Sequence, residues 1–270
     1  MSGFQQQYGP WALVAGASEG IGQAWCRSLA ERGLNVVLIA RRADPLESEA
    51  AELQARFGVQ TRTLALDLAS SELGERLQKA TDDLDVGFVV YNAAYSDIVE
   101  YLEQPMRSKL QTLDVNCRGV VVLTSLFAER LVARGRGGMV LMSSMAGWQG
   151  SAMVGIYAAS KAFVTVLAES LWSELRPHGV DVHACVAGAT LTPNFKSQTP
   201  QARQRSAFPM EPDAVVDAAL SRLGKGPTII AGRVNRAVYV LLGKLIPRTA
   251  AVRFFSRTTR GIYAERAPRS

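Results

Sequence analysis

Seven short apolar segments recur along the first 232 residues of the chain, and longer amphipathic segments separate them. Apolar strands that lack polar alternation are typical of sheets that are covered on both faces. The segments between them have the period of helices. We expect strands at residues 11–16, 35–40, 61–67, 86–92, 138–143, 180–186 and 227–232. We expect helices at residues 20–32, 45–57, 70–81, 106–134, 153–177 and 212–223.

This alternation of strands and helices predicts an α/β fold. Consecutive βαβ units give a parallel sheet, and their right-handed crossovers place helices on both faces. The predicted fold class is therefore a doubly wound parallel sheet, a Rossmann fold, with a C-terminal helical extension. No internal repeat, linker or low-complexity segment divides the chain. We expect one domain over residues 1–232 and a basic amphipathic extension over residues 233–270.

The composition excludes several classes of protein. With 48% hydrophobic and 20% charged residues, the chain is not disordered. Its three cysteines, Cys26, Cys117 and Cys185, are too few for a disulfide framework or a zinc site, and they suit a reducing cytoplasm. We expect no signal peptide and no membrane-spanning helix, because the sequence has no basic and apolar leader and no apolar run of about 18 residues. The two histidines, His178 and His183, form no ligand cluster, so we expect no metal.

The first predicted strand runs into a glycine-rich turn, AGASEGIG, with glycines at Gly16, Gly20 and Gly22. A turn of this kind between the first strand and the first helix lets the backbone approach a pyrophosphate. The helix N-terminus then offers free N–H groups and the positive end of its dipole. No G-K-[ST] sequence follows, which argues against a P-loop. The turn therefore predicts a dinucleotide site, and a merely tight strand–helix turn is the alternative.

The end of the second predicted strand indicates which dinucleotide is bound. An Asp or Glu at this position would bind the ribose 2′-hydroxyl of NAD. Here Ala40 takes that position and is followed by Arg41 and Arg42. Because a guanidinium pairs well with a 2′-phosphate, the sequence favours NADP(H) over NAD(H). Two solvated arginines after a strand are the alternative.

The sequence YAASK places the phenol of Tyr157 and the ammonium of Lys161 one helical turn apart. A nearby cation favours the ionised phenol and lowers its pKa from the usual value of about 10. The pair could then donate and accept a proton near neutral pH. A tyrosine ring stacked on a lysine stem is the alternative, since the spacing alone is weak evidence.

Together these motifs resemble the short-chain dehydrogenase/reductase family, of the common type, over residues 10–232. The glycine-rich turn is similar to the family's T-G-x-x-x-G-x-G turn, and Asp67 resembles the acid that meets adenine. The sequence YNAA at 91–94 is similar to N-N-A-G, and AGATLT at 187–192 is similar to P-G-x-x-x-T. The chain departs from these patterns at Ala15, Tyr91, Ala94 and Ala187.

The resemblance implies an active site with four catalytic residues. Tyr157 would be the general acid in reduction and the general base in the reverse direction. Lys161 would lower the tyrosine pKa and hold the nicotinamide ribose. Ser144 would stabilise the oxyanion, and Asn116 would hold a water that links Lys161 to solvent. The implied cofactor-binding residues are Gly16, Ser18, Glu19, Gly20, Ile21, Gly22, Arg41, Arg42, Asp67, Leu68, Asn92, Ala93, Ala94, Tyr157, Lys161, Gly188, Thr190 and Thr192.

Each of these positions also has a structural interpretation. Ser144 could cap a loop, and Asn116 could kink its helix. Thr190 and Thr192 could cap a turn without touching a cofactor. The joint presence of all the motifs in family order favours the catalytic interpretation.

A closer likeness is to the branch of the family that contains the type 3 and type 12 17β-hydroxysteroid dehydrogenases, of which type 12 is a very-long-chain 3-oxoacyl-CoA reductase. It rests on YGPWALVAGASEGIG, LNVVLIARR, TRTLALDLAS and RTTRGIYAE. The likeness implies an NADP(H)-dependent oxidoreductase that interconverts a ketone and a secondary alcohol on a hydrophobic substrate, a 3-oxoacyl thioester or a steroid-like compound.

Two alternative functions stay open. One is a dehydrogenase of another alcohol class, such as a small secondary alcohol, a sugar or a retinoid. The other is a non-catalytic protein that senses NADP, although a sensor need not retain Ser144, Tyr157 and Lys161. We expect a homo-oligomer, a dimer or tetramer, in the cytoplasm, and no nucleic-acid partner.

The positive charge of the chain lies in its C-terminal extension. The net charge is +6, and residues 233–270 carry nine Lys or Arg residues and one acid, so they hold +8 and the other 232 residues hold −2. Apolar residues recur at helical spacing on both sides of Pro247. We predict two helices that cap the body or another subunit, or whose apolar face shields the substrate mouth or touches a membrane surface. In the last two cases the basic face would meet anionic headgroups or the phosphates of CoA. The apolar residues of the first helix are Ala237, Val238, Leu241, Leu242 and Leu245, and the second helix places Val252, Phe255, Thr259 and Ile262 on one face.

Overall fold

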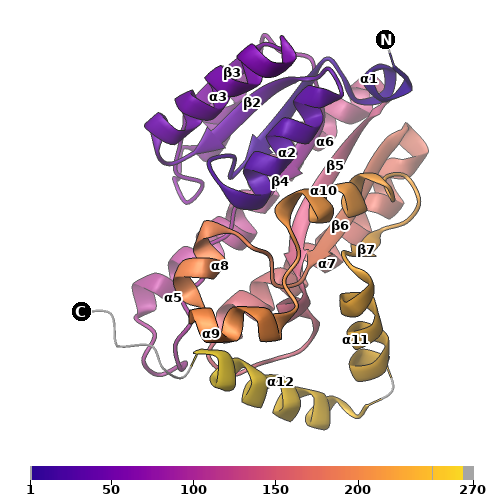
Figure 1. Cartoon of the computed structure of the whole chain (residues 1–270). Helices are drawn as coiled ribbons and strands as arrows, with labels where there is room; N and C mark the ends of the chain where they lie inside the picture. The colour runs from indigo at the N-terminus through magenta and orange to yellow at the C-terminus, as the bar shows by residue number, and fades with distance from the viewer. Residues whose placement is uncertain (1, 245, 264–270) are drawn as a thin grey trace.

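The computed structural model describes residues 2–244 and 246–263. Its centre is a seven-stranded sheet in which every pairing is parallel, in the order β3-β2-β1-β4-β5-β6-β7 (Figure 1). The predicted fold class is therefore confirmed. The strands are β1 (Trp11–Ala15), β2 (Asn35–Ala40), β3 (Thr61–Ala65), β4 (Val86–Tyr91), β5 (Gly137–Ser144), β6 (Val180–Ala187) and β7 (Thr228–Ile230).

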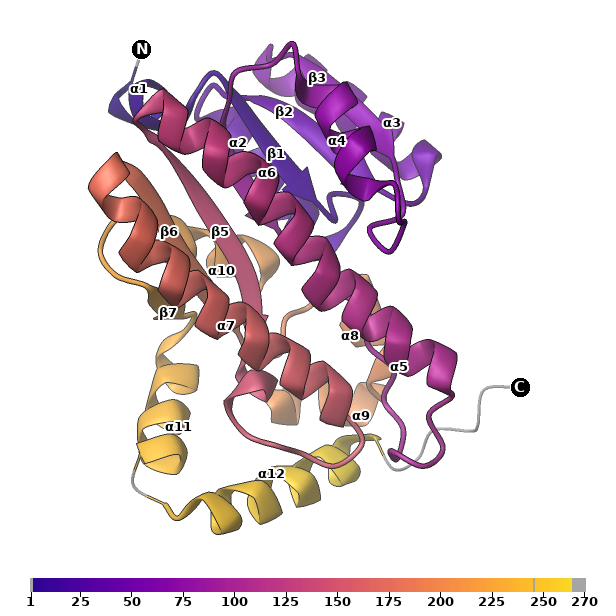
Figure 2. The ribbon, with the colours of Figure 1, turned by 180° about the vertical axis from the view of Figure 1, so that it is seen from behind.

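Helices cover both faces of the sheet. One core lies between the sheet and α1, α2, α3 and α10, and the other lies between the sheet and α4, α6 and α7 (Figures 1 and 2). The α-helices are α1 (Gly3–Tyr8), α2 (Gly20–Glu31), α3 (Ala43–Phe57), α4 (Leu73–Thr81), α5 (Met106–Leu113), α6 (Gly119–Arg134), α7 (Gly155–Leu175), α8 (Pro193–Gln198), α9 (Gln201–Gln204), α10 (Pro212–Leu220), α11 (Arg233–Lys244) and α12 (Arg248–Tyr263). Short turns of other helix types are η1 (Asp114–Arg118), η2 (Met145–Trp148), η3 (Arg176–His178) and η4 (Arg205–Ala207).

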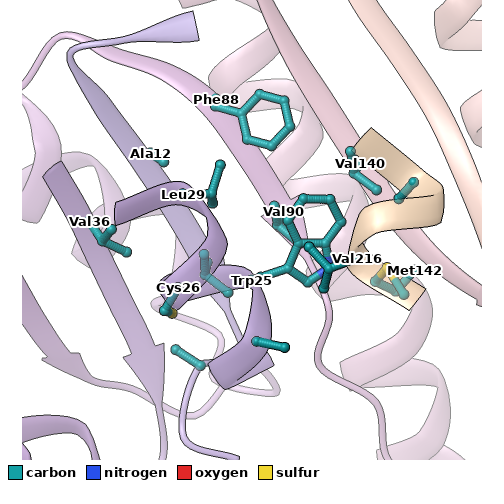
Figure 3. Close-up of a cluster of buried hydrophobic side chains, with 14 of the residues drawn as sticks. Ala12, Trp25, Cys26, Leu29, Val36, Phe88, Val90, Val140, Met142 and Val216 are labelled. Atoms are coloured by element: carbon teal, nitrogen blue, oxygen red, sulfur yellow. The ribbon is translucent and has the colours of Figure 1, made fainter. Parts of the chain in front are cut away.

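The Trp25 ring of α2 fills the middle of the first core. Figure 3 shows it beside Val90 of β4 and Val216 of α10, and its ring centroid lies 6.1 Å from that of Phe88. Trp25 is fully buried, and all six residues of β4 are buried. This packing fixes α2, and with it the glycine-rich turn that precedes α2, against the central strands. Truncating such a side chain typically destabilises a protein by about 3–5 kcal/mol.

The strand order reverses between β1 and β4, because the chain runs outward from β1 to β3 and then returns to the other side of β1. The connections that leave β1 and β4 at their carboxyl ends therefore diverge to opposite sides of the sheet. In doubly wound sheets, ligands bind in the crevice that forms at this point. The topology thus places any binding site at the carboxyl edge, near Gly16 and Asn92.

The long helix predicted over residues 106–134 is interrupted. α5 and α6 flank a single π-helical turn, η1, which contains Asn116. A π turn accommodates an extra residue and is often found at functional sites. Here the Asn116 side chain turns inward and bonds to the backbone of Tyr95, a contact that sequence periodicity cannot indicate.

The third predicted strand also ends early, at Ala65 rather than Asp67. The reason is local, because the Asp67 side chain accepts a hydrogen bond from the backbone N–H of Ala69 at 2.9 Å. That interaction closes a turn and draws the chain out of the sheet.

The C-terminal extension forms the two predicted helices, α11 and α12, which lie beyond the carboxyl edge of β5 to β7 in both views (Figures 1 and 2). α12 turns Phe255 and Ile262 inward and buries Ala251. α11 differs from the expectation of one buried apolar face, since Leu241 is exposed and the helix meets the body through Tyr239, which packs on Trp148. Leu245 and residues 264–270 lie outside the described residues.

Candidate active site

A cavity of about 660 Å³, the first cavity, opens at the carboxyl ends of β1, β2 and β4. It brings together residues from turns that are far apart in sequence, as the topology requires. Twelve of the residues predicted to bind the cofactor line it: Gly16, Ser18, Glu19, Ile21, Arg41, Arg42, Asp67, Leu68, Asn92, Ala93, Ala94 and Thr192.

The glycine-rich turn has the shape that a dinucleotide cradle requires. Gly16 has a φ of +88°, and a Cβ there would lie 2.7 Å from the Ala93 Cα. Gly22 does not line the cavity, but a Cβ on it would lie 1.8 Å from the carbonyl oxygen of Gly16. Asn92 holds the same carbonyl through its Nδ2 at 2.9 Å. Only glycine therefore permits the turn to close so tightly.

The N-terminus of α2 faces the space that this turn encloses. The helix has 12 residues and begins at Gly20, and the side chain of Glu19 makes no capping hydrogen bond to it. Its first N–H groups are therefore free to receive the phosphates of a dinucleotide. The residues present fit a bound dinucleotide in both backbone shape and dipole direction.

Arg41 and Arg42 both line the first cavity beside Ala40. Arg42 pairs with Glu19 at 3.1 Å, and both side chains are largely exposed. Arg41 forms no ion pair with any residue in the described part of the chain. The cavity wall thus offers one guanidinium that is paired with a carboxylate and one that is available to an incoming anion.

A second cavity of about 410 Å³ contains Ser144, Tyr157 and Lys161. Ser144 ends β5, and the other two residues lie one turn apart on α7. Lys161 is only 3% exposed, and its Nζ donates to the carbonyl oxygen of Met142 at 2.8 Å. Burial lowers the pKa of Lys161 to about 8. The ammonium is therefore held by the backbone of β5, in a place where its charge is poorly solvated.

The expectation that Lys161 lowers the pKa of Tyr157 is wrong for this structure. Burial raises the pKa of Tyr157, and a hydrogen bond with Ser144 opposes the rise only in part. The Lys161 Nζ lies 5.9 Å from the centroid of the tyrosine ring, because it reaches toward Met142 instead. Tyr157 is therefore a protonated phenol at neutral pH, with Ser144 beside its oxygen.

Asn116 is completely buried and lines neither cavity. Its Nδ2 donates to the carbonyl oxygen of Tyr95 and to the Ser160 hydroxyl, each at 2.9 Å, and its Oδ1 accepts from the Tyr95 N–H at 2.8 Å. Both hydrogens of the amide are thereby used. The side chain fixes the loop after β4 to α7, and it has no donor left for the water that the resemblance implied.

Gly188 and the two predicted threonines line the second cavity. Thr190 is buried and donates to the Gly188 carbonyl at 3.1 Å. Thr192 caps α8 by accepting from the Phe195 N–H at 3.1 Å, and it lines the first cavity as well. Gly20 lines neither cavity, but it packs against Thr192, because a Cβ on Gly20 would lie 2.7 Å from the Thr192 Cγ2. Thr192 therefore both caps a helix and borders the two cavities.

Comparison with known proteins gives the family. A family model described as "short chain dehydrogenase" matches residues 10–203. The chain belongs to the short-chain dehydrogenase family. The family predicted from the sequence motifs is thereby confirmed.

Two of the names found among the relatives of this short-chain dehydrogenase are 7beta-hydroxysteroid dehydrogenase and very-long-chain 3-oxoacyl-CoA reductase. A 7beta-hydroxysteroid dehydrogenase of Collinsella aerofaciens is 33% identical over 86% of this chain and 89% of its own length. A very-long-chain 3-oxoacyl-CoA reductase of Phaeosphaeria nodorum is 34% identical over 80% of this chain and 64% of its own length.

Solved structures support the same family. One from a study of 7beta-hydroxysteroid dehydrogenase stereoselectivity aligns with a TM-score of 0.89 at 30% identity, over 93% of this chain and 98% of the other. A short-chain dehydrogenase from Sphingobium yanoikuyae in complex with NADPH aligns with a TM-score of 0.72 at 26% identity, over 97% of this chain and 98% of the other. The protein is thus an oxidoreductase of the short-chain dehydrogenase family.

In this short-chain dehydrogenase, α12 forms one wall of the second cavity. The wall consists of Phe255, Thr258, Thr259, Ile262 and Tyr263. Three of these residues belong to the face that the helical spacing of the extension predicts, and shielding of the substrate mouth is one of the roles expected for that face.

α12 is tied to two loops of the body. The Ser151 hydroxyl bonds to that of Thr259 at 2.8 Å, and the Ala152 N–H donates to the Ser256 hydroxyl at 3.0 Å. Arg260 pairs with Glu100 at 2.7 Å on the other side. These polar contacts hold the helix over the cavity.

Metal and membrane signals are absent from the part of the chain that the structure describes. Within residues 2–244 and 246–263, no three His, Cys, Asp or Glu residues lie together as a potential metal site. No helix in the same ranges is both long and apolar enough to cross a bilayer. His183 is buried on β6, and burial lowers its pKa to about 4, whereas His178 is exposed.

Proposed function

We propose that the protein is an NADP(H)-dependent oxidoreductase that interconverts a ketone and a secondary alcohol on a hydrophobic, steroid-like substrate. The observation that carries the proposal is that the two cavities share a wall. Seven residues line both: Ile21, Asn92, Ala94, Ser96, Thr192, Asn194 and Gln198. A dinucleotide in the first cavity would therefore end beside Tyr157, where a carbonyl could be bound.

The chain's own residues account for the proton chemistry. Tyr157, whose phenol is protonated at neutral pH, donates a proton to the substrate oxygen in reduction and accepts it in oxidation. Ser144 donates a hydrogen bond to the same oxygen and stabilises its developing charge. Lys161 supplies a buried positive charge next to Tyr157, and Asn116 positions the loop after β4. The cofactor, when bound, supplies or accepts the hydride.

The two arginines support NADP(H) as the cofactor. Arg41 is available to a 2′-phosphate, and Ala40 leaves no carboxylate at the end of β2 to bind a ribose hydroxyl. The guanidinium at position 41 and the missing carboxylate at position 40 therefore both favour NADP(H) over NAD(H). Gly188, Thr190 and Thr192 would meet the nicotinamide end, where the cavities join.

The second cavity supports an apolar substrate of limited size. Lys161 is the one residue that is charged at neutral pH among the described residues that line it, and Ile98, Val154, Phe255 and Ile262 make its walls apolar. A volume of about 410 Å³ is in the range of sites for small organic molecules. A steroid-like ketone fits this description, and the acyl part of a 3-oxoacyl thioester is the alternative.

The surfaces support further parts of the proposal. α6 and α7 expose Val121, Phe163 and Val166, which favours a homo-oligomer that pairs these helices. The outer side of the extension exposes Leu241 and Phe254 among arginines, which favours peripheral contact with an anionic membrane. The three cysteines are free thiols, as suits a cytoplasmic enzyme.

Replacing Tyr157 with phenylalanine tests the proposal. The variant keeps the ring and removes the proton donor, so reduction of a ketosteroid by NADPH should fall by about 10²–10⁴-fold. NADPH binding, measured by calorimetry, should be unchanged. Tyr101→Phe is the matched control, because Tyr101 is 58% exposed and lines neither cavity.

A panel of ketosteroids, 3-oxoacyl-CoAs and small ketones, each with NADPH and NADH, identifies the substrate class. Turnover of any ketone excludes a protein that only senses NADP. Activity of Tyr157→Phe within a few-fold of the parent would contradict the assigned proton donor.

A further inference from the structure

Gln149 is a buried polar residue whose amide has no partner. It follows η2 directly and is only 4% exposed. No residue within the described ranges forms a hydrogen bond with its Oε1 or its Nε2. A primary amide offers two donors and an acceptor, and leaving them unmatched away from water destabilises the protein. Buried side chains of this kind are rare, and one that borders a cavity lies where a ligand could supply the missing partner.

Gln149 lines the second cavity together with Ser144 and Tyr157. The backbone on either side of it is held in place by the C-terminal helices. Trp148 packs on Tyr239 of α11, and the N–H of Ala152 donates to α12. The unmatched amide therefore belongs to a fixed segment of the cavity wall rather than to a loose loop.

The neighbouring polar groups of the wall already have partners within the protein. The Ser151 hydroxyl bonds to Thr259, the Thr190 hydroxyl donates to the Gly188 carbonyl, and the Lys161 Nζ donates to Met142. None of them needs the amide of Gln149. The cavity wall thus contains a donor and an acceptor that its own residues leave unused.

The charges around the cavity limit what the amide can bind. Lys161 is the one residue charged at neutral pH among the described residues that line the cavity, and its ammonium is bound to the backbone of β5. A cationic substrate group would lose its hydration there without gaining a counter-ion, and an anionic group would find one only at Lys161, beside the reacting end of the cavity. A neutral oxygen, which an amide can bind as donor or acceptor, has no such penalty.

We propose that Gln149 recognises the substrate by binding a second neutral oxygen, a hydroxyl or a carbonyl, on its apolar scaffold. The inference rests on the proposed function, in which Ser144 and Tyr157 bind the reacting oxygen. Gln149 then selects among ketones of similar shape by the presence of this additional oxygen. The substrate class is a ketone with at least one further hydroxyl or keto group that lies within the cavity.

The variant Gln149→Met tests the inference, because methionine is close to glutamine in shape and has no amide. The probes are ketosteroids with one ring hydroxyl or one additional keto group, each paired with the analogue that lacks it. For at least one pair, the parent enzyme should prefer the oxygenated member by about tenfold or more in kcat/KM. In Gln149→Met this ratio should fall to about one, while kcat/KM for the analogue without the oxygen stays as in the parent.

Ser151→Ala is the matched control, because Ser151 lines the same cavity and its hydroxyl is already bonded to Thr259. It should change kcat/KM for both members of a pair by the same factor. Gln149→Met without ligands should melt at or above the temperature of the parent, because it removes an unmatched buried amide. A lower melting temperature would reveal a protein partner for the amide and overturn the inference.

Calorimetric binding of the same pairs to the NADPH-loaded enzyme separates this inference from the proposed function. If no ketone is reduced, the reductase proposal fails, and the binding ratio still decides the role of Gln149. A ratio near one for every pair in the parent, or a ratio that persists in Gln149→Met, overturns the inference whether or not reduction occurs.

Discussion

Replacing Lys161 with methionine should abolish turnover and at the same time stabilise the folded protein. The ammonium is almost completely buried, and its one hydrogen bond goes to the neutral carbonyl of Met142. Nothing on the cavity wall neutralises its charge. A methionine side chain would fill much of the same space without a charge to desolvate.

The magnitude follows from the pKa of Lys161. Burial lowers it from 10.5 to about 8. At 1.36 kcal/mol for each pH unit, this difference corresponds to about 3 kcal/mol of lost stability at neutral pH. The hydrogen bond to Met142 offsets about 1 kcal/mol of that loss. Lys161→Met should therefore be more stable than the parent by about 2 kcal/mol at pH 7.

Urea unfolding between pH 7 and pH 10.5 measures both the size and the sign of the effect. The unfolded chain binds the Lys161 proton up to its ordinary pKa of 10.5, whereas the folded chain releases it near pH 8. Stability of the parent should thus rise, relative to the variant, as the pH increases from about 8 to about 10.5. The advantage of Lys161→Met should shrink over the same range.

Lys79→Met provides the control, because Lys79 is exposed on α4 and lies in neither cavity. It should change stability by no more than about 0.5 kcal/mol at every pH. A Lys161→Met variant that is less stable than the parent at pH 7 would refute the reasoning, since it would show that the buried ammonium has a favourable partner.

Three other perturbations address the cofactor, the C-terminal helix and the core. The double change Ala40→Asp and Arg41→Ser should reverse the preference from NADPH to NADH, as measured by the ratio of their kcat/KM values, because it adds a repulsive carboxylate and removes a guanidinium. Glu100→Gln should raise KM a few-fold with little change in kcat, because it breaks the ion pair with Arg260 that helps to hold α12. Salt at 0.5 M, on the order of several times physiological ionic strength, should raise the KM of the parent in the same way. His183→Leu should remove the part of the stability loss that occurs as the pH falls from about 6.5 to about 4. In that range His183 takes up a proton in the unfolded chain but not in the folded chain. Urea unfolding against pH is the assay, and this variant and a substitution of the exposed His178 should differ only within that pH range.

The fold could be predicted because its determinants are local. Each parallel strand is a short apolar run with turn residues on both sides, and β4 is buried along its whole length as its sequence requires. The geometry of the glycine-rich turn can likewise be predicted from its sequence, since the turn needs a positive φ at Gly16. The interruption at η1 was not predictable in the same way, because it depends on Asn116 reaching a loop 21 residues earlier in the chain.

The structure brings most of the predicted site residues to the two cavities, but the pKa of Tyr157 differs from the expectation. Tyr157 and Lys161 lie on one helical face as their spacing predicts, but the direction of the ammonium depends on Met142, which lies on another element. Burial, which sets the pKa of both groups, is a property of the assembled fold. The position of α12 over the second cavity likewise depends on contacts between segments about 100 residues apart. The same contacts adjoin the segment that carries the unmatched amide of Gln149.

Under the proposed function, the wall that the two cavities share makes the binding of cofactor and the binding of substrate depend on each other. The loop after β4 contributes Asn92, Ala94 and Ser96 to both cavities, and Asn116 anchors it to α7 through Tyr95. A ligand that orders this loop from one side leaves less conformational entropy to be lost when the other ligand binds. The coupling is reciprocal, so whatever factor NADPH adds to the affinity for the ketone, the ketone must add to the affinity for NADPH.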